Sequence, residues 1–211
     1  MRTLNMVDKD YFNTIEKASL AEFKDRGSRF NAHAFPIADL NQFKEKLAAI
    51  KKEHPKATHH CFAYRLGLDD NKFRVSDDGE PSGSAGRPIL GQIDSRQLTN
   101  VLVIVVRYFG GTLLGVPGLI NAYKSSAAIA LQLTPVIRKP VEITYMLQFD
   151  YTIMNDVMTM IKQCDCRVIS QEMQLFCQMQ VAVPKNRADE VLFKVKEIRS
   201  LEIEKITEPR K

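Results

Sequence analysis

One stretch, residues 101–123, constrains the fold most. It opens with the six apolar residues Val-Leu-Val-Ile-Val-Val, which are rich in β-branched side chains and too few for a helix of their own. They predict a strand buried in the middle of a sheet. Two adjacent glycines, Gly110 and Gly111, then predict a tight loop, because glycine adopts positive φ angles freely. Pro117 suits the first turn of the helix that we expect to follow.

Charge is distributed unevenly along the 211 residues, whose formal net charge is +5. Residues 1–139 contain 20 basic and 14 acidic side chains, whereas residues 140–211 contain 10 and 11. Between Asp94 and Glu142 there is no carboxylate, yet five basic residues lie there, including Arg107 and Lys124. This bias is compatible with an anionic partner, although a modest basic excess also serves solubility alone.

The chain is expected to be a cytoplasmic protein that does not enter a membrane. It shows no secretory signal pattern, and no apolar run approaches the roughly 18 residues that span a bilayer. Its four cysteines are therefore expected to be reduced thiols rather than a disulfide framework. With 45% apolar residues it can form one large or two small cores.

In the first part of the chain, strand and helix patterns alternate. Partly alternating residues at 14–19 and 28–35 predict two antiparallel strands around a turn at Asp25-Arg26-Gly27-Ser28. An amphipathic helix is expected from Asp39, its N-cap, to His54, and a strand at 58–66. Residues 77–88 form a long loop that we expect to contribute nothing to a core, and such loops often carry function.

Residues 135–211 show a different order of strand and helix patterns. Residues 135–140 contain two prolines and two basic residues and are expected to be a linker. The order strand, helix, strand, strand, helix, strand follows, which is typical of the ferredoxin-like split βαβ fold. We therefore predict an α+β protein with two domains, at residues 1–137 and 141–211.

Polar motifs in the first part have both functional and structural interpretations. His59 and Cys61 face one side of their strand and His60 the other, so two ligands at most converge, fewer than zinc requires. We expect packing there and no metal site. The acidic residues Asp77, Asp78 and Glu80 could hold a cation, perform acid–base chemistry, or form a solvated turn. An arginine lying opposite would make them a structural ion-pair network instead.

The glycine loop also leaves two interpretations open. Gly110 and Gly115 have the spacing of a phosphate-binding loop, but Val116 stands where that motif requires lysine. The glycines could bind an anion through backbone N–H groups, or they could allow close packing.

Five blocks taken together resemble the IMPACT/YigZ family; they are Asp25–Phe30, Ala57–Cys61, Ser76–Gly83, Ala85–Gly86 and Arg107–Gly111. The resemblance implies a first domain with the α/β sandwich fold of the second domain of a small-subunit ribosomal protein. It implies a second domain similar to the fifth domain of elongation factor G. Eukaryotic relatives regulate translation through a stress-kinase pathway by binding its activator, whereas no settled activity is implied for the bacterial branch.

These observations predict a non-enzymatic binding or regulatory protein that acts around translation through RNA, the ribosome or a protein partner, without a cofactor. The alternative is an enzyme acting on a phosphorylated or nucleotide ligand in a cleft of the first domain. Arg107 is the one charge in an apolar strand, so it must meet the loop at residues 77–88, which we call the acidic loop, or an anionic partner. The candidate binding residues are Arg29, His59, His60, Asp77, Asp78, Glu80, Arg87, Arg107, Tyr108, Gly110, Gly111 and Lys124.

Overall fold

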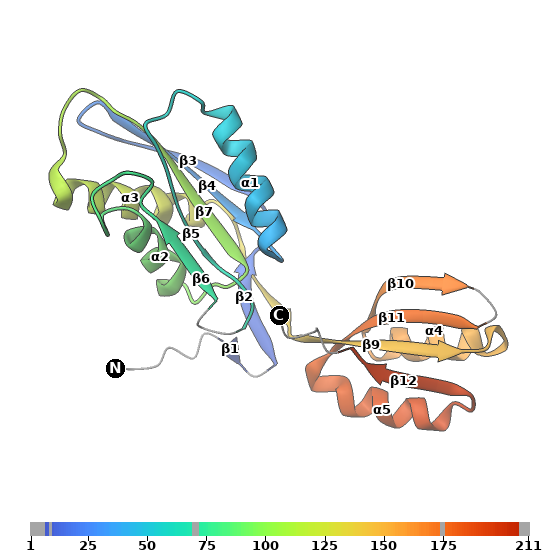
Figure 1. Ribbon diagram of the computed structural model, residues 1–211. Helices are drawn as coiled ribbons and strands as arrows, with labels where there is room; N and C mark the ends of the chain where they lie inside the picture. Colours follow the sequence, from blue (N-terminus) through green and yellow to red (C-terminus); the bar gives the residue numbers. More distant parts are fainter. Residues whose placement is uncertain (1–6, 9, 69–71, 174–175, 207–211) are drawn as a thin grey trace. The chain divides into compact units, whose positions relative to one another are not determined.

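The computed structural model describes residues 7–8, 10–68, 72–173 and 176–206. The chain is a mixed α+β protein that divides into two compact units (Figure 1). Of the described residues, unit 1 contains 7–8 and 12–139, and unit 2 contains 140–206 together with residues 10 and 11.

Unit 1 is built on a five-stranded sheet with the strand order β3-β4-β7-β5-β6, in which all neighbouring strands are antiparallel. One helix, α1, packs on one face, and α2 and α3 pack on the other. The elements of this three-layered arrangement are β3 (Ser19–Asp25), β4 (Ser28–Pro36), α1 (Leu40–Glu53), β5 (His59–Arg65), β6 (Phe73–Ser76), α2 (Gly86–Ser95), β7 (Val101–Tyr108) and α3 (Gly115–Gln132).

Strand β7 lies in the middle of the sheet, as its six apolar residues predicted. Val101, Val103 and Val105 face the core beneath α2 and α3. Leu102, Ile104 and Val106 face the core beneath α1. A strand covered on both faces needs apolar residues at every position, which explains why the run does not alternate with polar residues.

The first hairpin differs from the prediction. The strand that pairs with β4 is β3 at Ser19–Asp25 rather than residues 14–19. Residues Arg26 and Gly27 form its two-residue turn, with φ angles of 44° and 81°. Two positive φ angles fit the tight turn that joins directly adjacent strands, so β3 must end at Asp25. Residues 11–15 form a separate strand, β2 (Tyr11–Ile15).

Two loop predictions were also wrong in part. Ser84 and Ala85, within the loop expected to be free of core residues, are fully buried, because α2 begins at Gly86 and the loop runs down into the core. The expected linker forms strand β8 (Val136–Pro140), which pairs with β2 in a three-stranded sheet completed by β1 (Val7–Asp8). Helix α1 and its Asp39 N-cap were predicted correctly.

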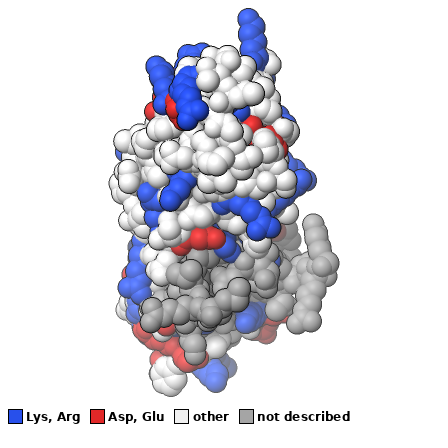
Figure 2. Space-filling view, turned by 90° about the vertical axis from the view of Figure 1, so that its left-hand side faces the viewer, with Lys and Arg blue, Asp and Glu red and all other residues white. Residues whose placement is uncertain are grey.

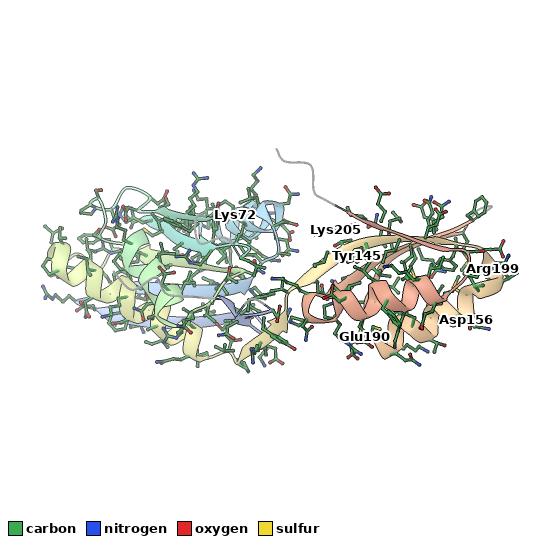
Figure 3. The ribbon with its side chains drawn as sticks, turned by 90° about the horizontal axis from the view of Figure 1, so that it is seen from below. Lys72, Tyr145, Asp156, Glu190, Arg199 and Lys205 are labelled. Carbon is green, nitrogen blue, oxygen red and sulfur yellow. The ribbon has the colours of Figure 1, made fainter. Side chains whose placement is uncertain are left out.

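Unit 2 has the predicted order of elements, and its four-stranded antiparallel sheet has the order β10-β11-β9-β12. Helices α4 and α5 cover one face, where Figure 3 labels Asp156 and Glu190. The core consists almost wholly of apolar side chains such as Leu147, Met179 and Val181. The elements are β9 (Glu142–Phe149), α4 (Met154–Gln163), β10 (Arg167–Met173), β11 (Cys177–Pro184), α5 (Ala188–Glu197) and β12 (Leu201–Lys205).

Candidate functional site

Arg107, near the end of β7, meets the acidic loop rather than solvent. Its Nη1 donates to Glu80 Oε1 at 2.7 Å, and the two side chains are only 7% and 3% exposed. The rings of Phe30 and Phe109 lie 5.4 and 5.7 Å from the guanidinium carbon. A buried guanidinium and a buried carboxylate stabilise the fold only when each compensates the other, so this pair holds the acidic loop against the sheet.

Glu80 has a second donor that the sequence did not reveal. The hydroxyl of Tyr123, on α3, donates to the same Glu80 Oε1 at 2.7 Å. The thiol of Cys61, on β5, lies 3.3 Å from the Tyr123 oxygen and 3.0 Å from the carbonyl oxygen of Asp77. We call Cys61, Glu80, Arg107 and Tyr123 the buried polar cluster. It joins β5, β7, α3 and the acidic loop in one network.

The pKa values of this cluster oppose nucleophilic chemistry. Burial raises the pKa of Cys61 far above its usual value, and the carboxylate of Glu80 adds to that rise. Burial likewise raises the pKa of Tyr123. Because the thiolate, not the thiol, is the reactive form, Cys61 is an inert packing residue, as the strand pattern indicated.

Asp77 organises the acidic loop. Its carboxylate accepts hydrogen bonds from the backbone N–H groups of Gly83, Ala85 and Gly86 at 2.8–3.0 Å. Burial alone would raise its pKa, but these three bonds and the charge of Arg87 outweigh that effect and lower it. The carboxylate thus fixes the loop that leads into α2.

Asp78 joins the two histidines to the same loop. Its Oδ2 accepts the backbone N–H of His60 at 2.6 Å, and its carbonyl oxygen lies 2.8 Å from Nδ1 of His59. Nε2 of His59 lies 3.8 Å from Glu80 Oε1, at the edge of the buried polar cluster. His59, Asp77, Asp78, Glu80 and Arg107 are therefore brought together, as expected of a common constellation.

His60 and Tyr108 belong to a second cluster, on the α1 face of the sheet. Nε2 of His60 lies 3.2 Å from the carbonyl oxygen of His54, whose Nδ1 lies 2.9 Å from the Tyr108 hydroxyl. The ring of His33 lies 5.5 Å from that of His54. Exposed Arg29 covers the Tyr108 ring at 5.2 Å. Burial lowers the pKa of both His33 and His60, which favours the neutral form of these rings in the folded protein.

The glycine pair allows close packing. A Cβ at Gly110 would stand 1.9 Å from the backbone carbon of Gly27, so any side chain there would collide with the β3–β4 turn. The N–H of Gly110 donates to the hydroxyl of Ser28 at 3.2 Å. Gly111 has a φ of 85° and open space around it. At Gly110 the packing interpretation of the loop is therefore correct.

Two predicted site residues stand apart. Arg87 and Lys124 are exposed, and no hydrogen bond or ion pair to the buried polar cluster is found for either within the described part of the chain. Arg87 acts on the loop through its charge near Asp77. Lys124 follows Tyr123 on α3 but points to solvent.

An exposed apolar surface lies beyond the glycine pair and was missed by the sequence analysis. Phe109, Leu113, Val116 and Ile120 are 48%, 82%, 46% and 39% exposed. We call them, together with Lys124, the loop–helix surface. They lie on the loop after β7 and on the first three turns of α3, at one end of unit 1 (Figure 1). Figure 2 views the molecule from that side and shows uncharged surface with lysine and arginine side chains, and fewer aspartate and glutamate side chains, around it.

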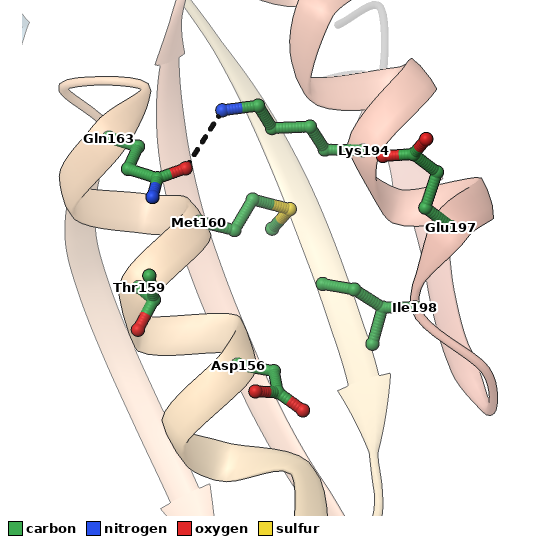
Figure 4. A pocket seen from close by; sticks show the side chains of 7 residues that line it. All are labelled: Asp156, Thr159, Met160, Gln163, Lys194, Glu197 and Ile198. Carbon is green, nitrogen blue, oxygen red and sulfur yellow. Dashed lines mark hydrogen bonds between the residues drawn. The ribbon is translucent and has the colours of Figure 1, made fainter.

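Unit 2 contains a cavity of about 280 Å³ between α4 and α5, which holds none of the predicted site residues. Figure 4 shows Lys194 reaching across it, where its Nζ donates to Gln163 Oε1 at 2.9 Å above Met160. The described ranges contain no group of three or more His, Cys, Asp or Glu residues arranged to hold a metal ion. Within those same ranges, no helix is both long and apolar enough to cross a membrane.

Comparisons with known proteins show which family this chain resembles. The sequence profile described as "Impact N-terminal domain" matches residues 26–131. "IMPACT family member YigZ" of Escherichia coli is 35% identical over 169 residues, which cover 79% of this chain and 81% of that protein. "Protein IMPACT" of Rattus norvegicus is 37% identical over 100 residues, which cover 45% of this chain and 31% of that protein.

A solved structure supports the fold over nearly the whole chain. A crystal structure described as that of a hypothetical protein superposes with a TM-score of 0.75 at 30% sequence identity, covering 96% of this chain and all of the other. The matched profile contains β5, the acidic loop, β7 and most of α3, which carry the buried polar cluster. The chain belongs to the IMPACT family.

Proposed function

We propose that this protein is a non-enzymatic binding protein that acts around translation through RNA or a protein partner. Family membership supports the role in translation, because the resemblance to the IMPACT/YigZ family implies that eukaryotic members regulate it. One observation supports binding over catalysis. The side chains that could do chemistry are used in structural hydrogen bonds inside unit 1, whereas its exposed loop–helix surface is free to contact another molecule.

The alternative, an enzyme acting on a phosphorylated or nucleotide ligand, would need at least one of the three carboxylates of the acidic loop. Asp77 accepts three backbone N–H groups, and Asp78 accepts that of His60. Glu80 is buried between Arg107 and Tyr123. A thermal-shift panel of nucleotides and phosphosugars with magnesium tests this alternative, because a bound ligand raises the melting temperature by mass action.

We also infer that the two units have the folds implied by the resemblance. The sheet order β10-β11-β9-β12 in unit 2 supports a ferredoxin-like fold, in which the first and third strands lie at the centre. The three-layered arrangement of unit 1 supports a ribosomal-protein-like α/β sandwich. The domain bounds 1–137 and 141–211 and the cytoplasmic location are likewise proposals.

Ribosome co-sedimentation across a salt series tests the proposed role. Arg107 is unsuitable for substitution here because it is buried, so the exposed cation Lys124 replaces it. We expect association at low salt that falls as salt rises and weakens in the Lys124→Glu variant. Lys44→Glu, on the exposed side of α1, is the control and should bind as the natural chain does. No association at low salt would refute a ribosomal partner.

A further inference from the structure

The loop–helix surface concentrates exposed apolar side chains in a short part of unit 1. Four of its residues, Phe109, Leu113, Val116 and Ile120, are exposed large apolar side chains that lie within twelve residues of one another, and Leu113 is the most exposed of all such side chains in the described chain. Val116 and Ile120 are four residues apart on α3 and so lie on one helix face. Scattered exposed apolar residues need no explanation, but a cluster of this kind marks an interaction site.

The charges that the loop and α3 themselves contribute to this surface are positive. Lys124 continues the helix face of Val116 and Ile120 by one more turn, and it is exposed. No carboxylate occurs between Asp94 and Glu142, and the first turn of α3 contains no acidic residue. The N-terminus of α3 has no side-chain cap, so the positive end of its helix dipole adds to the charge of Lys124. Charge complementarity therefore favours an acidic partner.

We propose that the loop–helix surface binds a protein segment that carries both apolar side chains and carboxylates. This inference rests on the proposed function, because it names the chemistry of the partner in that binding role. The apolar side chains of the segment pack on Leu113, Val116 and Ile120, and its carboxylates lie near Lys124 and the N-terminus of α3. Helical segments of this kind bind apolar faces through residues spaced three and four apart.

Single-stranded RNA fits this surface less well. Proteins that bind single strands stack the bases on aromatic rings and follow the phosphates with basic side chains. Here Phe109 is the single aromatic residue beside three aliphatic ones, and Lys124 is the single cation that continues the helix face. Aliphatic side chains offer no stacking platform, whereas they pack well against leucine-like side chains of a protein.

Packing against the core of unit 1 holds the loop–helix surface in a fixed conformation, which favours specific binding. Gly110 fits against the backbone of Gly27, and buried Leu114, Leu119 and Tyr123 anchor the first turns of α3 in the core. A preformed surface loses little conformational freedom on binding. The exposed apolar residues are thus presented by a fixed loop and helix.

Site-specific photo-crosslinking on the full chain tests the proposal. A photoreactive amino acid replaces Leu113 in one variant and Leu20, an apolar residue of β3 that is 58% exposed, in the control. Both are expressed in the source cells, irradiated, and the crosslinked segments identified by mass spectrometry. We expect position 113 to yield at least about tenfold more adduct than position 20, on a segment rich in both apolar and acidic residues. Adding Lys124→Glu should lower that yield severalfold.

Four outcomes would overturn the proposal. Adducts to RNA would identify a nucleic-acid surface, and adducts to a second copy of this chain would identify a self-association surface. Equal yields at positions 113 and 20, or a crosslinked segment with a net positive charge, would refute the specific site. Ribosome co-sedimentation separates this failure from that of the proposed function. If association persists without a specific adduct at 113, the site is wrong, and a specific adduct to a protein outside translation refutes the role instead.

Discussion

The buried polar cluster and the loop–helix surface lie in the same unit, and residues 107–124 contribute to both, yet the two are opposites in character. Arg107 and Glu80 are charged and almost wholly buried, whereas Leu113 and Val116 are apolar and exposed. The charged residues hold β7, the acidic loop and α3 together. The usual rule that charged residues bind partners and apolar residues build the core therefore fails in this part of the chain. Its charged groups build the fold, and its exposed apolar groups are free for recognition.

The largest effect is expected from Arg107→Met. This change leaves the Glu80 carboxylate buried without its cation and should destabilise unit 1 by about 3–5 kcal/mol. Hydrogen exchange followed by mass spectrometry is suited to the measurement because it monitors each unit separately. Peptides from β7 should lose protection, whereas peptides from β11 in unit 2 serve as the internal reference. Unchanged exchange in β7 would mean that the ion pair does not hold the sheet.

The double variant Glu80→Gln with Arg107→Met sharpens this prediction. Removing both charges leaves no uncompensated ion in the core, and the amide oxygen introduced by Glu80→Gln can still accept the Tyr123 hydroxyl hydrogen. We therefore expect most of the protection lost in Arg107→Met to return. If the double variant were as unstable as the single one, the damage would come from lost packing rather than from the unpaired carboxylate.

A smaller effect is expected from Gly110→Ala, which tests the link between the hairpin turn and the loop. The new Cβ would stand 1.9 Å from the Gly27 backbone, so the loop must move away, at a cost of roughly 1–3 kcal/mol. Gly91→Ala is the control, because nothing lies within 4 Å of that Cβ and alanine favours the helix by up to about 1 kcal/mol. Thermal unfolding of both variants checks the contrast. Equal melting temperatures would contradict it.

The histidine cluster predicts that unit 1 loses stability below neutral pH. Burial lowers the folded-state pKa of His33, with neighbouring His54 adding to the effect, and burial also lowers that of His60 against the opposing influence of Asp78. The unfolded chain, with histidine pKa values near 6.5, therefore binds more protons as the pH falls. The stabilisation is complete above that pH and is lost below it, by at most about 1.4 kcal/mol per histidine and pH unit.

Hydrogen exchange of β4 and β7 at pH 7.5 and 5.5 measures this loss. Glu53 and Lys51 also face the histidine cluster, and Glu53 partly opposes the lowering of the His33 pKa. The pH dependence of the stability of unit 1 therefore has contributions from more than one group. The variant His33→Gln should show a shallower dependence than the natural chain. A dependence of the same slope in both proteins would exclude His33 as a contributor.

The smallest effect on stability is expected from Leu113→Asp. The side chain is 82% exposed, so its replacement should change the free energy of unfolding of unit 1 by no more than about 0.5 kcal/mol. Its effect should instead appear in binding. A marked loss of protection in α3 would show that Leu113 belongs to the core of the folded unit and not to a docking surface.

The sequence predicted the centre of the fold because its signals there were strong. An apolar run buried on both faces could only be a central strand, and the charge of Arg107 required a partner that the acidic loop supplied. The pairing of the first hairpin was mispredicted because alternation extends through residues 11–25, so pattern alone does not fix where the strand begins. Only the positive φ angles of Arg26 and Gly27 fix its end.

The site residues beyond the acidic loop were harder to predict. Tyr123 lies among alanines on a helix that is apolar on nearly every face, so no periodicity distinguishes its buried hydroxyl from an exposed one. The same feature hid the loop–helix surface, although Val116 and Ile120 recur at the spacing of a second apolar face. An apolar helix with two such faces covers the core with one and leaves the other for a partner.

Ribosome co-sedimentation at low salt of two variants that both remain folded would separate architecture from recognition. The first is the double variant Glu80→Gln with Arg107→Met, and the second is Leu113→Asp. If the buried polar cluster is architecture and the loop–helix surface performs recognition, the double variant should associate as the natural chain does, and Leu113→Asp should lose association. The reverse result, with association lost in the folded double variant and kept in Leu113→Asp, would show that these two roles have been assigned the wrong way round.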